Sequence, residues 1–280
     1  MAIELVTKFS PKVDELFTQE SKLSLLTNKD YDFDGAHTVK VYSIGTAPMT
    51  DYGRSGPEEG NWSRYGEVDN LTATTQSLTL SKDRSFTFVI DTLDEDETSA
   101  TLKAATAMAR QTREVIIPEV DTYVYGVMCS GADTANKPAA VALTADNIYS
   151  EILKGSEALD NAMVPDTQRC LVVSPAVYTL MKTSGDIIMN TDVTAEMRLK
   201  GVIGMIDGLT VVRVPAARLP EKFGFMIAHP SATCAPVKLE AMRTHQNPPG
   251  ISGWLCEGRI VYDAFVLKNK TKGIYYQATT

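Results

Sequence analysis

The alternation of apolar and polar positions predicts a chain that mixes strands and helices. Apolar and polar residues alternate over residues 38–44 and again over 77–90, which is typical of half-buried strands. Apolar residues then recur at helical spacing over 94–117, resume after Pro118 and stop before Gly131. We therefore expect two strands followed by one long helix that breaks near the proline.

The second half of the chain has the pattern of an α/β region. Helical spacing covers 144–163, with Ile148, Ile152 and Leu159 facing inward, and a further helix is expected over 194–204. Ser174 followed by Pro175 predicts a helix start, because serine caps helices and proline suits the first helical position. Apolar runs predict short strands at 169–173, 209–214, 223–229, 238–244, 258–267 and 274–277.

The first 30 residues are expected to form a mostly helical arm. Ser10 and Pro11 form a helix-start signal, and acidic residues follow in the first turn. An apolar stripe then comes from Val13, Leu16, Phe17, Leu23, Leu25 and Leu26. Such a stripe has to cover something, so we expect the arm to pack on the body of its own chain or of a neighbour.

Residues 45–76 form a long segment rich in Gly, Pro, Asn, Ser and Thr that has too few apolar residues for a core of its own. Loops of this length are uncommon unless they have a function. We expect a two-stranded flap whose aromatic and charged residues make a protein contact. The candidate contact residues are Tyr52, Arg54, Glu58, Glu59, Trp62, Arg64, Tyr65 and Glu67.

Composition excludes several classes of protein. The 280 residues are 44% hydrophobic and 22% charged, which is ordinary for a globular protein with a sizeable core. The net charge of −8 argues against a sequence-reading nucleic-acid protein. The 4 cysteines are far apart in the sequence, which disfavours a structural zinc site and a disulfide framework. No stretch of the sequence is apolar over the length needed to span a membrane.

The sequence offers little chemistry. His37, His229 and His245 are scattered, and no nucleophile, P-loop or dinucleotide motif is present, so we assign no catalytic or cofactor-binding residue and no cofactor. The acidic run 94–97 lacks the glycine of a calcium loop, and we interpret it as a helix N-terminus rather than a metal site.

The order of these parts resembles the HK97-type major capsid proteins of tailed bacteriophages and prophages. Three stretches carry the resemblance: residues 80–91 with the acids that follow, residues 117–123, and residues 262–275. They are similar to capsid proteins from phages of Gram-positive bacteria. The resemblance covers nearly the whole chain.

The resemblance implies an α+β capsid fold with four regions. These are an N-terminal arm at 1–37, a peripheral (P) domain within 38–139, an axial (A) domain at 140–250, and C-terminal strands at 251–280 that return to the P domain. An extended β-hairpin, the E-loop, would occupy about 46–80, and the long spine helix about 94–117. The E-loop would lie across a neighbouring subunit.

The implied function is structural. The chain would self-assemble into pentamers and hexamers of an icosahedral shell that encloses double-stranded DNA, as the capsid of a virion assembled in the host cytoplasm. Its partners would be copies of itself, a separate scaffolding protein, a portal, and DNA bound non-specifically, without any membrane. Some relatives carry a long N-terminal scaffolding segment that is cut off during maturation. Here the arm starts almost at once, so we expect either that this sequence is the mature form or that a separate scaffolding protein is needed. Others crosslink an E-loop lysine, but no lysine lies between Lys40 and Lys82, so we expect a non-covalent shell.

Alternatives remain open at this point. The same fold could build an encapsulin-like compartment or a gene-transfer particle, which the neighbouring genes would distinguish. An α/β enzyme would need a polar pocket with a catalytic group, and a peptide-binding module would use the flap as a clamp.

Overall fold

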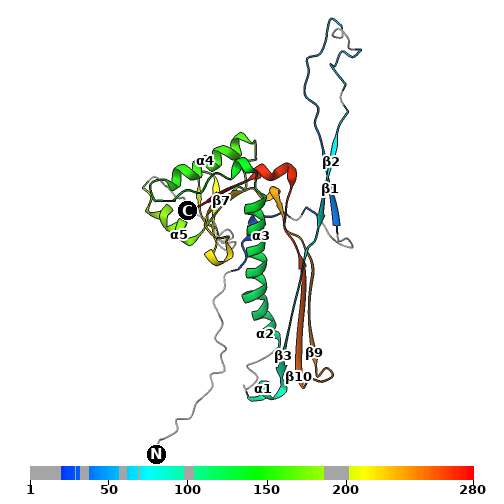
Figure 1. Cartoon of the computed structure of the whole chain (residues 1–280), viewed down its shortest axis with the longest axis vertical. Helices are drawn as coiled ribbons and strands as arrows, with labels where there is room; N and C mark the ends of the chain where they lie inside the picture. The colour runs from blue at the N-terminus through cyan, green and yellow to red at the C-terminus, as the bar shows by residue number, and fades with distance from the viewer. Residues whose placement is uncertain are drawn as a thin grey trace, which may run out of the picture. The chain divides into compact units, whose positions relative to one another are not determined.

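The computed structural model describes residues 20–28, 30–31, 38–56, 62–68, 70–97, 104–185 and 202–280, and the chain divides into two compact units (Figure 1). One unit is Gly35–Thr79, here called the hairpin unit. The other, here called the body, combines Met1–Asp34 with Leu80–Thr280. Most of the predicted helical arm, including Ser10 and Pro11, lies outside the described residues.

The body contains all the described α-helices and most of the described strands. The helices are α1 (Thr92–Glu97), α2 (Ala104–Gln111), α3 (Ile117–Gly131), α4 (Ile148–Asn161) and α5 (Pro175–Thr183). The strands are β3 (Lys82–Asp91), β4 (Cys170–Val173), β5 (Val202–Ile206), β6 (Leu209–Arg213), β7 (Phe223–Ala228), β8 (Thr233–Cys234), β9 (Val237–Gln246), β10 (Gly253–Tyr262), β11 (Phe265–Val266) and β12 (Ile274–Ala278). The two short strands β8 and β11 pair with each other.

A five-stranded sheet forms the centre of the body, in the order β12-β7-β4-β6-β5, and only β4 and β6 run parallel. Strands β4 and β7 are buried along their whole length, because helices cover both faces. Val172 and Met226 pack with α3, whereas Leu171 and Ile227 pack with α4 and α5. Figure 1 shows α3 on one side of β7 and α4 and α5 on the other. The result is a three-layer α/β/α core.

A second, three-stranded antiparallel sheet has the order β3-β10-β9. The helix that includes α3 lies along one of its faces. Arg84 of β3 donates to Glu119 of α3 at 2.7 Å, and the Tyr262 hydroxyl of β10 donates to the same carboxylate at 3.3 Å. The opposite face of this sheet is open to solvent, as the exposed Ser85 and Thr87 indicate.

The long helix continues through Pro118 without ending. Residues Thr112–Ile116 form a π-helical turn between α2 and α3, in which the Ile117 N–H bonds to the Thr112 carbonyl. Pro118 has no N–H, and its ring would crowd the carbonyl four residues earlier, so the turn before it widens. The predicted break is therefore a local change of winding, and α3 continues to Gly131, close to where the helical pattern of the sequence stops.

Other boundaries also differ from the sequence-based expectations. The single strand expected over 77–90 is two strands, because β2 (Ala73–Thr79) pairs with β1 (Thr38–Ile44) whereas β3 pairs with β10. The helix expected over 194–204 is wrong where the structure describes it, since residues 202–204 belong to β5. The strand expected over 258–267 is divided between β10 and β11.

Two glycine substitutions should have opposite effects on stability. Gly258 of β10 lies opposite Phe86 of β3, and a Cβ atom at 258 would overlap the Phe86 ring. Gly126 lies in α3 with open space around its Cβ position. We expect Gly258→Ala to lower the free energy of unfolding by about 1–3 kcal/mol, and Gly126→Ala to raise it by about 0.5–1 kcal/mol. Chemical denaturation followed by circular dichroism measures both, and equal effects of the two changes would contradict the packing described for Gly258.

Candidate interaction surfaces

The hairpin unit is a two-stranded antiparallel ribbon. Strands β1 and β2 pair from Thr38 opposite Thr79 to Ile44 opposite Ala73. The pairing continues beyond them, because the Gly45 N–H donates to the Thr72 carbonyl at 2.8 Å. Two strands without a third strand or a helix are marginally stable in water. The ribbon therefore has little stability of its own.

The distal part of the ribbon is ordered by a small set of contacts. The Gly53 N–H donates to the Arg64 carbonyl at 2.9 Å, and the Thr50 hydroxyl donates to the Tyr65 carbonyl at 2.7 Å. The rings of Tyr52 and Tyr65 meet edge to face, with centroids 5.0 Å apart. Gly66 has a φ of +88°, where a side chain would be strained and would overlap Thr50.

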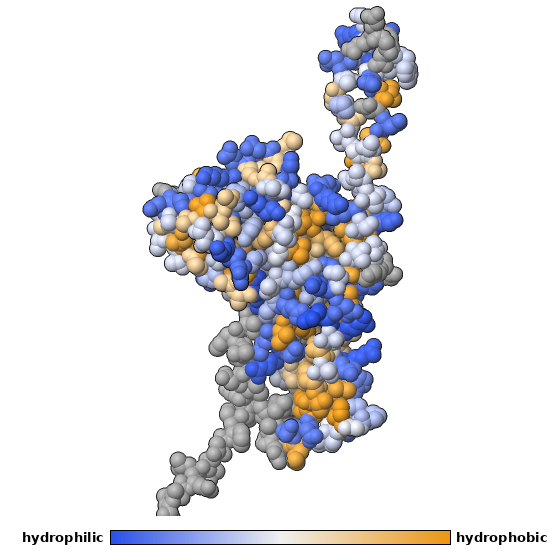
Figure 2. All heavy atoms as spheres, in the orientation of Figure 1, coloured by the Kyte–Doolittle hydropathy of each residue, from blue (hydrophilic) through white to orange (hydrophobic). Residues whose placement is uncertain are grey.

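The hairpin unit carries more than half of the large apolar side chains that are exposed among the described residues, and Figure 2 shows them interspersed with polar ones. Met49 is 99% exposed, Trp62 is 83% exposed and Tyr65 is 78% exposed. The others are Tyr42, Ile44, Tyr52, Val68 and Leu71. Scattered exposed apolar residues are normal, but a concentration on one thin ribbon indicates a surface that another molecule covers.

The structure places most of the predicted contact residues on this ribbon. Tyr52, Trp62 and Tyr65 are exposed, as are Arg54, Arg64 and Glu67, whereas Glu58 and Glu59 lie outside the described residues.

Sequence reasoning missed the other exposed apolar residues of the ribbon, which are Tyr42, Ile44, Met49, Val68 and Leu71. A signal for two of them was present: strand β1 has apolar residues on both faces, with Val39 and Val41 on one and Tyr42 and Ile44 on the other. Such a strand is typical of one that is covered on both sides.

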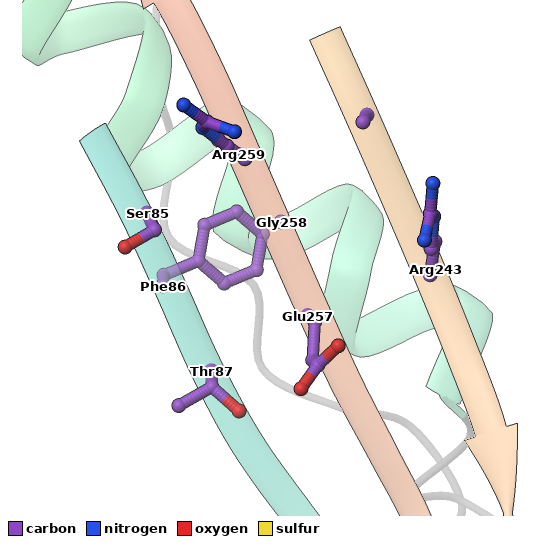
Figure 3. A pocket seen from close by; sticks show the side chains of 8 residues that line it. Ser85, Phe86, Thr87, Arg243, Glu257, Gly258 and Arg259 are labelled. Atoms are coloured by element: carbon purple, nitrogen blue, oxygen red, sulfur yellow. The ribbon is translucent and has the colours of Figure 1, made fainter. Parts of the chain in front are cut away.

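The open face of the three-stranded sheet is a second candidate surface. A hollow of about 550 Å³ lies over it, lined by side chains from all three strands, including Thr87, Arg243 and Glu257 (Figure 3). On the same face, Arg259 donates to Asp83 at 2.8 Å, and His245 Nε2 lies 3.6 Å from Glu257. The hydrogen bond from Arg259 lowers the pKa of Asp83. This surface carries both signs of charge, and its described residues present no reactive group held by a base.

A histidine–serine contact in the body has a structural explanation. His229 Nδ1 lies 2.7 Å from the Ser231 hydroxyl and accepts the Ser231 N–H at 3.2 Å, which caps the 3₁₀ turn Pro230–Ala232. Burial, together with the charges of Arg169 and Lys270, lowers the pKa of His229. No carboxylate orients this ring in the contacts of the described residues, so the pair lacks the third member of a catalytic triad.

Metal and membrane sites were also sought in the described part of the chain. Within it, no group of three or more His, Cys, Asp or Glu side chains could hold a metal ion. None of its helices combines the length and apolar character needed to cross a bilayer.

Comparison with known proteins points to one family. The sequence profile of the phage capsid protein family matches residues 73–277. None of the curated proteins matches the chain.

Several solved structures share the fold. A chain from Mycobacterium phage Che8 is 18% identical, with a TM-score of 0.75 over 98% of this chain and 97% of that chain. A chain from the capsid of cyanophage P-SCSP1u is 12% identical, with a TM-score of 0.74 over 99% and 93%. A chain from the mature capsid of bacteriophage PhiM1 is 17% identical, with a TM-score of 0.69 over 99% and 92%.

The fold is therefore the α+β capsid fold that the HK97-type resemblance predicted, and the family profile covers most of the chain. The chain belongs to the phage capsid protein family and is a structural major capsid protein.

Proposed function

We propose that the chain self-assembles into pentamers and hexamers that form the icosahedral shell of a virion around double-stranded DNA. The observation that carries this proposal is the concentration of exposed apolar side chains on the hairpin unit. The mature capsid of PhiM1 and the capsid of cyanophage P-SCSP1u, whose chains share the fold, support it.

The hairpin unit acts as the E-loop and lies across a neighbouring copy. Ordering each residue of such a flap costs about 1–2 kcal/mol of backbone entropy, and two strands alone offset little of that cost. A neighbouring copy supplies the missing surface. Contacts between two different surfaces of identical chains can close into rings. Arg54, Arg64 and Glu67 give the hairpin unit both signs of charge, which suits such a contact.

The sheet partners support a division of the body into two domains. The P domain consists of the three-stranded sheet with α2 and α3, and the A domain consists of the five-stranded sheet with α4 and α5. Strand β9 then belongs to the P domain, although it lies within the range 140–250 expected for the A domain, because it pairs with β10. Strand β12 belongs to the A domain rather than to the returning C-terminal strands, because it pairs with β7.

The chain has a structural role rather than an enzymatic one. A separate scaffolding protein and a portal would complete the assembly in the host cytoplasm. DNA contacts would be sparse and non-specific, since the net charge of −8 opposes extensive phosphate binding.

Sedimentation velocity of the purified protein at increasing concentration tests the proposal. We expect species of very high mass that correspond to shells, tubes or sheets, with or without an added scaffolding protein. A monomer at every concentration, even with the scaffolding protein from the same genome, would contradict it.

The same sample should contain no covalent crosslinks between subunits. The E-loop range has no lysine between Lys40 and Lys82 that could form an isopeptide bond. After boiling and reduction, we expect a single monomer band on a denaturing gel. A ladder of dimers, pentamers and hexamers would show that another residue forms the crosslink.

A further inference from the structure

The hairpin unit is inserted into the body, and the chain segments on both sides of it contact the same helix. Residues 20–28 precede the hairpin unit and form the leading flank, and residues 80–82 follow it and form the trailing flank. Both flanks belong to the body, so their contacts with α3 are fixed within one compact unit.

The leading flank is held at several points. The Ser21 hydroxyl donates to Asp121 of α3 at 2.6 Å. Leu23 and Leu26 are buried in the apolar cluster between α3 and the five-stranded sheet. The Asn28 N–H donates to the Thr233 carbonyl at 2.9 Å. This flank therefore crosses the body as a strap, and its Ser21 side chain bonds to Asp121.

Asp121 is itself part of a buried pair. Its side chain is 2% exposed, and its second carboxylate oxygen accepts from Arg218 at 2.7 Å. Burial raises the pKa of Asp121, while the Ser21 hydroxyl and Arg218 act in the opposite direction. The positive charge of Arg218 thus stabilises the buried carboxylate of Asp121, which accepts the hydrogen bond from Ser21 of the strap.

The trailing flank is held by a second buried carboxylate. The Ser81 N–H donates to Asp263 at 2.7 Å, and the Tyr123 hydroxyl of α3 donates to the other oxygen of Asp263, also at 2.7 Å. Asp263 is 4% exposed, and the adjacent Leu80 is equally buried. Lys82 Nζ lies 4.8 Å from the centre of the Tyr123 ring. A backbone group of the flank is therefore connected to α3 through one carboxylate.

The two attachment points lie on different sides of α3. Residues 121 and 123 are two positions apart, which is about 200° around a helix with 3.6 residues per turn. We infer that α3 is the anchor of the hairpin unit and that Asp121 and Asp263 are positioning residues, which fix its two flanks on opposite sides of one rigid element. The anchor fixes residues 20–28 and 80–82 on the body, and its importance for shell geometry rests on the proposed function.

Hydrogen exchange of the unassembled protein tests the anchor with a matched pair of variants. Tyr123→Phe removes the hydroxyl that holds Asp263 and keeps the ring. Tyr125→Phe makes the same change two residues later, where the buried hydroxyl has no partner among the described residues. We expect Tyr123→Phe to speed exchange at residues 80–84 by roughly three- to tenfold, with the rest of the body unchanged. Tyr125→Phe should leave residues 80–84 as in the wild type.

A second variant tests the other flank. Ser21→Ala should speed exchange over residues 22–28 to a similar degree and leave residues 80–84 unaffected. An anchor is contradicted if Tyr123→Phe behaves like Tyr125→Phe, or if exchange rises equally in every peptide.

Shell geometry is then compared by electron microscopy. Tyr123→Phe should give a wider spread of particle diameters than Tyr125→Phe. A wild-type protein that forms no particles would refute the proposed function and leave the exchange result on the anchor standing. Wild-type particles together with unchanged exchange in Tyr123→Phe would refute the anchor alone.

Discussion

Arg218→Leu should lower the free energy of unfolding by about 3–5 kcal/mol, the largest loss that we expect from any single substitution described for the body. The Arg218 side chain is 6% exposed and that of Asp121 is 2% exposed. Removal of the guanidinium leaves an ionised carboxylate in the core without its counter-charge. Urea denaturation followed by circular dichroism measures the loss, provided that the transition remains two-state.

The matched control is Arg84→Leu, because Arg84 makes an ion pair of the same length with Glu119. That pair is also 2.7 Å long, but its side chains are 61% and 40% exposed. Solvent screens it, so the loss should stay below about 1 kcal/mol. If the two leucine variants lost the same stability, the ion pair at Asp121 could not be treated as a buried one.

Trp62→Ser should reduce assembly strongly without affecting the fold of the subunit. Trp62 is 83% exposed in the single chain, so its loss removes little intramolecular packing. A tryptophan at the centre of an interface commonly contributes about 2 kcal/mol or more, which corresponds to roughly a 30-fold weaker contact. We expect the threshold concentration for assembly, measured by light scattering, to rise at least tenfold, with an unchanged unfolding midpoint.

Met163→Gln is the control, because it removes an exposed apolar side chain that does not belong to the hairpin unit. Met163 is 91% exposed and lies in the body after α4, outside the hairpin unit. Its replacement should leave the assembly threshold within about twofold of the wild type. If Trp62→Ser assembled normally, the exposed aromatic residues of the hairpin unit would not be contact residues.

The strongly periodic parts of the body could be predicted from the sequence. Ile148, Ile152 and Leu159 face the core in α4 as their spacing indicated, and Ser174 caps α5 with a bond from the Val177 N–H. These elements are covered by their own chain, so the apolar pattern and the burial agree. Strand β7 could be predicted from its continuous apolar run for the same reason.

The sequence-based predictions were wrong where pairing between strands that are distant in the sequence determines the structure. Residues 77–90 alternate without interruption, but the Ser81 N–H bonds to Asp263 rather than to a strand, and the pairing partner changes from β1 to β10 at that point. Residues 202–204 have an apolar pattern that suits a short helix or strand equally well, and pairing with β6 selects the strand. A local pattern contains no information about such distant partners.

The candidate site was only partly visible for a related reason. Arg and aromatic residues between Gly and Pro indicated a protein contact, whereas the exposed Met49, Val68 and Leu71 were not predicted. The positioning residues Asp121 and Asp263 were not predicted, because they become partners of Ser21 and Ser81 only after the chain has folded.

Electron microscopy of the purified protein at high concentration, with and without its co-expressed neighbouring genes, tests the central claim most directly. We expect closed shells, or regular tubes and sheets built from the same rings, in which the hairpin unit of each copy lies on the next copy. Isolated subunits under every condition, or particles whose hairpin units contact only their own chains, would contradict the account.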